Sequence, residues 1–279
     1  MLLIVAATTT AQHSSWRADP SWSNGKAEWA QYAATRVIYG EPRTYAAPIF
    51  TTPQHMDPAT TTKSGNAGAD GAIPVFKHNI SEIVPTENYD YRFLTTCFLD
   101  RNTLDVYKLV ISTQDDCGST YKQFVIDDGR VNSTSHCYFP GAGTTDQSYR
   151  RPGEPRNFTF HDALTLRLRD YPFDADPKPE MKLKLVEDQT NIKDSKPRPE
   201  EATVRYVGRE RITVPYGSIE THHLQVEHAP VGGASASDYW FAAEPDMRNV
   251  LVRYEGPFGV KYALKRLGWW AYWAEPQPQ

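Results

Sequence analysis

The fold is decided by the segment from Thr203 to Trp273, which reads TVRYVGRERITVPYGSIETHHLQVEHAPVGGASASDYWFAAEPDMRNVLVRYEGPFGVKYALKRLGWWAYW. Apolar and polar residues alternate along most of it: Val204 and Tyr206 flank Arg205, and the same alternation returns around Gln225. Alternation with a period of two places one face of a sheet against a core and the other toward water. The segment therefore predicts five or six β-strands.

Strand patterns also fill the N-terminal half of the chain. Four further strands are expected at residues 91–99, 104–113, 119–126 and 131–139. Short turns between consecutive strands are typical of an antiparallel meander, and the Tyr39-Gly40 turn predicts a hairpin upstream of it. One helix is expected from His161 to Asp170, with Asp162 in its first turn and Pro172 after its end. The sequence thus predicts a mainly β protein: a large curved antiparallel sheet, an open half-barrel, with one helix crossing it near residues 160–170.

Length and composition limit the domain organisation. The chain has 279 residues and can bury a full core as one large β domain. We expect a single mainly β domain over residues 12–279, with flexible loops at 52–70, 140–157 and 187–201. Residues 1–11 combine a short apolar run with small residues, which is typical of the end of a secretory signal. Export to the periplasm or cell envelope is therefore expected, and an ordinary N-terminal strand is the alternative.

Several classes of function are disfavoured by composition and motifs. The net charge is −4, so the basic footprint of a nucleic-acid-binding protein is missing. No apolar run is long enough to predict a transmembrane segment. The sequence also lacks GxSxG, Walker A, GxGxxG and HExxH motifs. We therefore expect no cofactor and name no catalytic residue.

The chain has three cysteines, Cys97, Cys117 and Cys137. One disulfide and one free thiol is the simplest arrangement for an exported protein, whereas three buried thiols would suit a cytosolic one. Cys117 and Cys137 are the candidate pair, although Cys137 should face Thr120, which leaves Cys117 diagonal to it. Nucleophilic catalysis by Cys117 is disfavoured because the carboxylates of Asp115-Asp116 raise the pKa of a neighbouring thiol.

Three histidines, His222, His223 and His228, are the nearest approach to a metal-binding cluster. Adjacent residues of a strand point to opposite faces, so His222 and His223 cannot reach one ion from regular β geometry. His222 and His228 share a face but lie about 20 Å apart in an extended strand. We therefore predict surface histidines on a hairpin and no metal site.

Two parts of the chain resemble known bacterial proteins. The pattern Tyr206 to Gly217, followed by Tyr239-Trp240-Phe241 and Val250 to Glu255, resembles the DUF3108 family of bacterial envelope proteins. That family is similar to the periplasmic lipoprotein carriers LolA and LolB, and the resemblance implies an open half-barrel around a helix. The N-terminal part, with Tyr39 to Arg43 and Ile73 to Asn79, is similar to proteins that carry the label septum formation inhibitor Maf. The Ser/Pro/Arg-rich loop of the α/β pyrophosphatases of that name is absent.

These observations lead to one functional expectation and two alternatives. A curved sheet with a helix across its mouth is a natural pocket for an apolar ligand. We expect a non-enzymatic envelope protein that binds a lipid-like or other apolar ligand in the concave face, lined by Tyr206, Leu224, Trp240 and Val252. The first alternative is a hydrolase acting on envelope or carbohydrate substrates, which requires two convergent carboxylates or a metal. The second is a structural or interaction module.

Overall fold

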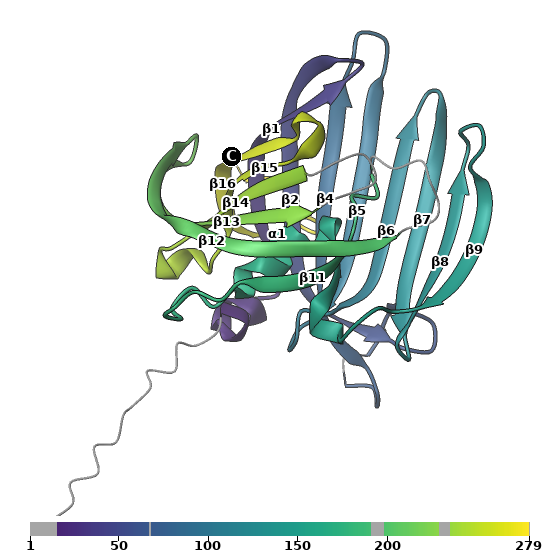
Figure 1. Cartoon of the computed structure of the whole chain (residues 1–279), viewed down its shortest axis with the longest axis horizontal. Helices are drawn as coiled ribbons and strands as arrows, with labels where there is room; N and C mark the ends of the chain where they lie inside the picture. Colours follow the sequence, from purple (N-terminus) through teal and green to yellow (C-terminus); the bar gives the residue numbers. More distant parts are fainter. Residues whose placement is uncertain (1–15, 67, 191–197, 229–234, 279) are drawn as a thin grey trace, which may run out of the picture.

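One sheet contains all sixteen strands that the computed structural model describes, over residues 16–66, 68–190, 198–228 and 235–278 (Figure 1). The strands are β1 (Ala27–Ile38), β2 (Glu41–Asp57), β3 (Thr62–Lys63), β4 (Ile73–Pro85), β5 (Asp90–Asp100), β6 (Val106–Asp115), β7 (Gly118–Asp127), β8 (Arg130–Cys137), β9 (Gly143–Arg150), β10 (Phe158–Phe160), β11 (Met181–Val186), β12 (Pro199–Val214), β13 (Gly217–His228), β14 (Ser235–Ala242), β15 (Leu251–Glu255) and β16 (Lys261–Trp270). Their order is β10-β11-β12-β13-β14-β15-β16-β1-β2-β4-β5-β6-β7-β8-β9, and β3 pairs with β2.

The sheet is open and strongly curved. Its two edge strands, β9 and β10, do not pair with each other. Figure 1 shows the C-terminal strands, coloured green to yellow, curling across the blue N-terminal strands, so that both halves face a shared interior. The C-terminal half joins the N-terminal half where β16 pairs with β1, from Ala27 opposite Trp270 to Thr35 opposite Lys261. The prediction of a mainly β fold built on one large curved sheet is confirmed.

The hairpin expected around Tyr39-Gly40 is also confirmed. β1 and β2 pair in antiparallel register up to Ile38 opposite Glu41. Both turn residues have positive φ, 55° for Tyr39 and 79° for Gly40. A tight two-residue hairpin requires such left-handed conformations, which glycine adopts freely and other residues adopt rarely.

The helix expected across the sheet is present as a short composite segment. Two 3₁₀ turns, η4 (His161–Ala163) and η5 (Leu168–Asp170), flank the four-residue helix α1 (Leu164–Arg167). All of its side chains from His161 to Arg169 are buried, as expected for a helix that is enclosed on every side. The segment fills much of the space inside the curve of the sheet.

The expected flexible loops are shorter than predicted. β2 continues through Asp57, and β3 follows within residues 52–70; β9 (Gly143–Arg150) lies within 140–157. β12 begins at Pro199, whereas residues 191–197 of the third loop lie outside the described residues. Residues 51–57, with the sequence TTPQHMD, and the polar strand β9 lack apolar alternation, so their sequences do not predict strands. Their backbone hydrogen bonds to β4 and β8 hold them in the sheet.

The proposed export signal, residues 1–11, also lies outside the described residues. Among the helices of the described chain, none is long and apolar enough to cross a membrane.

Candidate functional site

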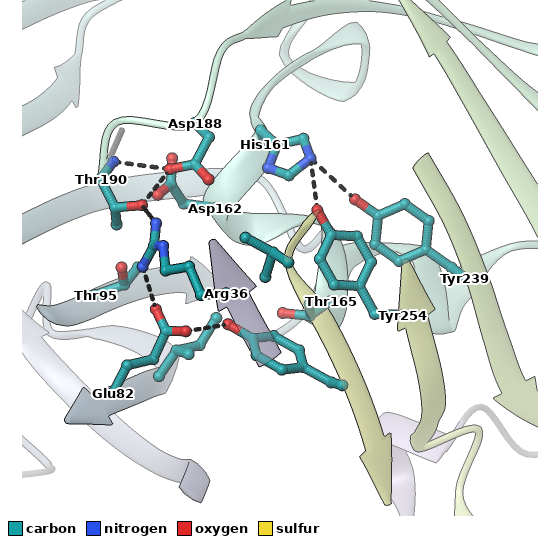
Figure 2. Close-up of a pocket in the computed structure, with 13 residues that line it drawn as sticks. Arg36, Glu82, Thr95, His161, Asp162, Thr165, Asp188, Thr190, Tyr239 and Tyr254 are labelled. Atoms are coloured by element: carbon teal, nitrogen blue, oxygen red, sulfur yellow. Dashed lines mark hydrogen bonds and ion pairs between the residues drawn. The ribbon is translucent and has the colours of Figure 1, made fainter. Parts of the chain in front are cut away.

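The interior of the half-barrel contains a cluster of ionisable side chains around a small cavity (Figure 2). Both halves of the sheet and the composite helix contribute to it. The polar lining residues are Arg36, Glu82, Thr95, His161, Asp162, Thr165, Asp188, Thr190, Tyr239, Tyr254 and Tyr262. Charged residues are almost never fully buried unless they are paired, so each of these groups needs a partner inside the protein.

An ion pair between β1 and β4 forms one side of the cluster. Arg36 Nη1 donates to Glu82 Oε2 at 2.9 Å, and the two side chains are only 2% and 5% exposed. Glu82 Oε1 accepts a second hydrogen bond from the Tyr262 hydroxyl at 2.9 Å and a third from the Tyr45 hydroxyl. The carboxylate therefore has the dense set of donors that a buried charge requires.

The chain that follows β11 is bound to the same cluster. Arg36 Nη2 donates to the Thr190 hydroxyl at 2.7 Å, and Asp188 Oδ1 accepts from the Thr190 backbone N–H at 2.8 Å. The Gln189 N–H donates to Asp162 Oδ2 at 3.1 Å. On the other side, Lys122 of β7, which is 1% exposed, donates to the Gln189 carbonyl at 3.3 Å. Residues 188–190 thus link the helical segment to β1 and β7.

Two carboxyl groups of the cluster have pKa values displaced in opposite directions. Burial, together with the charge of Asp188, raises the pKa of Asp162 well above its usual range. Burial also acts against ionisation of Asp188, but interactions with His161 and Arg36 and the Thr190 donors outweigh it and lower the pKa of Asp188. Since burial keeps His161 neutral at pH 7 by lowering its pKa, Arg36 and Thr190 carry this stabilisation. The geometry favours a neutral Asp162 beside an ionised Asp188.

His161 lies among hydroxyl groups of the C-terminal strands. Its Nε2 atom is 3.2 Å from the Tyr254 hydroxyl, 3.3 Å from that of Tyr239 and 3.4 Å from that of Ser237. Burial raises the pKa of both tyrosines, so their hydroxyls remain protonated. These contacts hold the N-terminal end of the helical segment against β14 and β15.

The interior cavity is too small for a lipid-like ligand. Its volume is about 40 Å³, whereas one water molecule occupies roughly 30 Å³ in the liquid. Ligand pockets for drug-sized molecules enclose roughly 300–1,000 Å³. The cavity can accept water or a very small polar molecule, and side chains fill the rest of the concave face.

A much larger cleft lies at one end of the half-barrel, with a volume of about 820 Å³. It lies between the N-terminal 3₁₀ turns η1 (Trp16–Ala18) and η2 (Pro20–Ser23), the end of the helical segment, and the loop after β14. Four rings line it: Trp16, Tyr171, Phe173 and His222. The Phe173 and His222 rings stack with centroids 4.3 Å apart, which fixes the apolar wall of the cleft.

A buried carboxylate organises the base of this cleft. Glu28, which is 2% exposed, accepts hydrogen bonds from Arg169 at 2.6 and 3.2 Å and from Arg248 at 3.2 Å. The Arg169 guanidinium lies 4.2 Å above the Trp16 ring. Both arginine charges are thus neutralised in part by Glu28, and the lining also carries the carboxyl groups of Asp19, Asp170 and Asp174, so the cleft presents rings next to charged groups of both signs.

Three of the four expected ligand-lining residues share the inner face, but they do not line a cavity. Tyr206 pairs with Leu224 across β12 and β13, and Leu224 pairs with Tyr239, whose hydroxyl contacts His161. Leu224 and Val252 are fully buried, so they form core and no ligand surface. Tyr206 is partly buried, and its ring stacks on Tyr171 beside the end cleft at 6.1 Å.

Trp240 lies on the opposite face, which corrects the expected grouping. It pairs with His223 and Arg253, stacks on the His223 ring at 4.2 Å and donates to Glu210 at 2.8 Å. The reason is the strand alternation itself: Trp240 follows Tyr239 directly, and Tyr239 points inward.

The histidines are separated as the strand alternation requires. His222 packs on Phe173 and His223 on Trp240, on opposite faces of β13. His228 is buried at 8% exposure rather than lying on the surface, since it packs near His161 with ring centroids 6.2 Å apart. Among residues with described positions, no three His, Cys, Asp or Glu side chains come together as a metal site.

The candidate disulfide between Cys117 and Cys137 is absent, and all three cysteines are free thiols. Cys137 is opposite Thr120, as the register predicted, and accepts a hydrogen bond from its hydroxyl at 3.3 Å. Cys117 is exposed in the turn before β7, where its thiol donates to the Tyr89 hydroxyl at 3.1 Å. The two cysteines therefore have different neighbours, which is why no bridge forms.

Sequence reasoning missed Arg36 and Glu82, although both leave a signal. Arg36 continues the buried positions Tyr32 and Ala34 of β1, and Glu82 lies between the buried Ile80 and Val84 of β4. A charged residue in the apolar phase of a strand indicates an interior partner.

Comparisons with known proteins identify the fold and no activity. No family model matches the chain, and no curated protein matches it. The structure is similar to the crystal structure of a β-barrel-like protein of a domain of unknown function, DUF1849, from Brucella abortus. The TM-score is 0.54 at 10% sequence identity, and the match covers 88% of this chain and 98% of that chain. At this identity the likeness shows a shared β-barrel-like fold, and the resemblance to DUF3108 and the Lol carriers stays a prediction.

Proposed function

We propose that the protein is an exported, non-enzymatic binding protein of the bacterial cell envelope, and that it holds an amphipathic, lipid-like ligand in the end cleft. The observation that carries the proposal is the cleft itself, whose volume of about 820 Å³ falls within the range of ligand pockets. Export is supported by the sequence of residues 1–11, and the envelope by the resemblance to DUF3108.

The chemistry of the cleft fits a molecule with an apolar part and a polar end. The stacked Phe173 and His222 rings offer an apolar wall, and the Tyr171 ring beside Phe173 extends it. Asn249 and the partly neutralised Arg248 lie at the same cleft and can donate to a polar group. The lining combines these rings with charged and amide side chains, so the cleft suits a ligand that has both apolar and polar parts.

Filling the cleft tests the proposal. Ala243, half-buried in its lining, is replaced by Trp, and Ala59, exposed in the turn after β2, receives the same substitution as a matched control. Lipids extracted from purified protein are measured by mass spectrometry, and binding of a fluorescent fatty-acid analogue is titrated. We expect Ala243→Trp to lose both signals and Ala59→Trp to keep them. Equal binding by the two variants, or none by the wild type, would contradict the proposal.

A hydrolase is the second candidate, and one observation favours it. Asp162 and Asp188 lie at one cavity, with the pKa of the first raised and that of the second lowered. A neutral acid beside an ionised carboxylate is the pairing that glycosidases use. The cavity of about 40 Å³ holds no sugar ring, so a glycoside could react there only where residues 188–190 move aside. Chromogenic glycosides that are cleaved by the wild type and not by Asp162→Asn or Asp188→Asn would favour this function over binding alone.

A further inference from the structure

Three hairpin tips lie next to each other along one rim of the sheet. They are the turns β1–β2, β4–β5 and β6–β7, and they are neighbours because β2 pairs with β4 and β5 with β6. Figure 1 shows the first two tips ending side by side on the same rim. Tyr39 belongs to the first tip, Tyr89 and Tyr91 to the second, and Cys117 to the third. Residues far apart in sequence thus meet at one point.

Three phenol oxygens converge there. The Tyr39 and Tyr89 hydroxyls are 2.7 Å apart, those of Tyr89 and Tyr91 are 3.3 Å apart, and those of Tyr39 and Tyr91 also form a hydrogen bond. The Cys117 thiol donates to the Tyr89 oxygen at 3.1 Å. The oxygens therefore form a small triangle, with a sulfur atom next to one corner.

We propose that Tyr39, Tyr89 and Tyr91 bind a ferric ion through their three phenol oxygens. A hard cation held at about 2.0 Å by ligands at right angles separates neighbouring ligand atoms by roughly 2.8 Å. Two of the three oxygen–oxygen distances, 2.7 and 3.3 Å, bracket that separation, and the third, between Tyr39 and Tyr91, is shorter. One face of a coordination shell is thus already assembled, and water can occupy the open side because Tyr39 is 70% exposed.

The charge balance selects a trivalent ion. Each phenol releases one proton on binding, and three phenolates neutralise three positive charges, whereas a divalent ion would leave an excess negative charge. Phenolate oxygen is a known ligand of protein-bound iron, while calcium and magnesium sites are built mainly from carboxylates and carbonyls. Asp115 also acts electrostatically on Tyr91, and its negative charge favours a cation at this rim.

The rings are held in position before any ion binds. Tyr39 has a positive φ of 55° at the β1–β2 turn, and its ring contacts Tyr91 of the neighbouring hairpin. The Tyr91 ring contacts Tyr39, Tyr89 and Phe93 with centroid distances of 6.0, 5.4 and 6.1 Å. The β4–β5 turn is closed by the Thr86 N–H and hydroxyl, both donating to the Tyr89 carbonyl at 3.1 and 2.6 Å.

Proton competition gives the site a distinctive pH dependence. Burial and the hydrogen bond with Tyr39 raise the pKa of Tyr91 to about 12, and hydrogen bonds with Cys117, Tyr39 and Tyr91 raise that of Tyr89 further. Metal binding that displaces protons strengthens as pH rises. Because binding releases phenol protons, the apparent affinity for the ion should increase with pH.

The test is a titration of the purified full-length protein with ferric nitrilotriacetate, followed by absorbance in the visible region. Phenolate bound to iron produces a charge-transfer band that neither component shows alone. The variants are Tyr39→Phe and Tyr91→Phe, which keep the rings and remove the oxygens, and the control is Tyr216→Phe in the exposed β12–β13 turn. Thermal unfolding of each variant establishes that it is folded.

We expect a band that saturates at one ion per chain, with protons released into weakly buffered solution. Tyr39→Phe and Tyr91→Phe should weaken binding by more than the roughly 10- to 100-fold loss that follows removal of an outer-shell partner, and Tyr216→Phe should not. The absence of a band in the wild type overturns the proposal. A band that survives unchanged in folded Tyr39→Phe overturns it equally, because the iron would then be bound elsewhere.

Discussion

Replacing Glu82 by Leu should destabilise the protein strongly, because it removes the carboxylate that is ion-paired with the buried Arg36 guanidinium and leaves Asp188 as a more distant counter-charge. Arg36 is 2% exposed and loses its 2.9 Å ion pair. Breaking a buried pair by removing one partner costs about 3–5 kcal/mol. The Tyr45 and Tyr262 hydroxyls lose their shared acceptor as well, and each unsatisfied buried group costs roughly 1–3 kcal/mol. Because such neighbours are not additive, we expect a loss of at least about 4 kcal/mol.

A loss of this size is a large share of the roughly 5–15 kcal/mol that stabilises a typical domain. At roughly 2 °C for each kcal/mol in a large domain, the melting temperature should fall by about 8 °C or more. Urea unfolding followed by tryptophan fluorescence measures the free energy, and calorimetry measures the melting temperature. The double variant Arg36→Met with Glu82→Leu should recover much of the loss, since replacing both charges by apolar groups is often nearly neutral.

The Arg43–Glu87 pair is the matched control. It has the same residue types and a contact of 2.6 Å, but Glu87 is 67% exposed. Exposed pairs contribute little because water screens both charges, so Glu87→Leu should change stability far less than Glu82→Leu. Equal effects of the two substitutions would refute the reasoning from burial. The reasoning would also be refuted if the stability lost by the Arg36→Met, Glu82→Leu double variant equalled the sum of the losses of the two single variants. The two charges would then be energetically independent.

Three further predictions concern groups with displaced pKa values or shared buried partners. Burial and, to a lesser extent, Arg169 lower the pKa of His78 to about 3. Stability that is present above about pH 6.5 should therefore be lost as pH falls through 3, by on the order of 5 kcal/mol in total. His78→Gln should flatten this part of an acid-unfolding curve. Burial raises the pKa of Asp162, so its neutral form is compatible with the folded state and its ionised form is not. Stability should therefore fall as pH rises above the ordinary aspartate pKa of about 3.9. Asp162→Asn should be more stable than the wild type at pH 8 and similar to it at pH 3. Glu28→Gln should lower the melting temperature and also weaken ligand binding in the end cleft, because Arg169 and Arg248 lose their common carboxylate; a normal melting temperature would contradict its structural role.

Strands could be predicted from the sequence where apolar and polar residues alternate, and could not be predicted where the strand is polar throughout. β12 and β13 carry alternating buried and exposed side chains, as their sequence indicated. β9 exposes or half-exposes every side chain, so nothing in its composition separates it from a loop. Its strand conformation depends on hydrogen bonds to β8. Such edge strands are specified by their neighbours more than by their own sequence.

The interior cluster was harder to predict because its members come from distant segments. Arg36 and Glu82 could be suspected, since each interrupts the buried phase of a strand. Asp162 and Asp188 left no comparable signal, because one lies on an irregular helical segment and the other follows a strand. Their proximity depends on how far the sheet curls around the helical segment, and local periodicity carries no information about that curvature.

The position of the buried charges also explains why the ligand site is proposed at the end of the half-barrel and not in its mouth. An apolar ligand inside the curve would have to displace residues 188–190 and expose or desolvate Arg36, Glu82 and Lys122. Each ion that is buried in an apolar environment without its partners costs several kcal/mol. Burial of a few CH₂ groups of an acyl chain, at about 0.8 kcal/mol each, stabilises the complex by less than that. The end cleft requires no such displacement, since Glu28 already satisfies its arginines. The ionised interior therefore acts as a filled core that fixes the curvature of the sheet, and that curvature leaves the cleft open at its end.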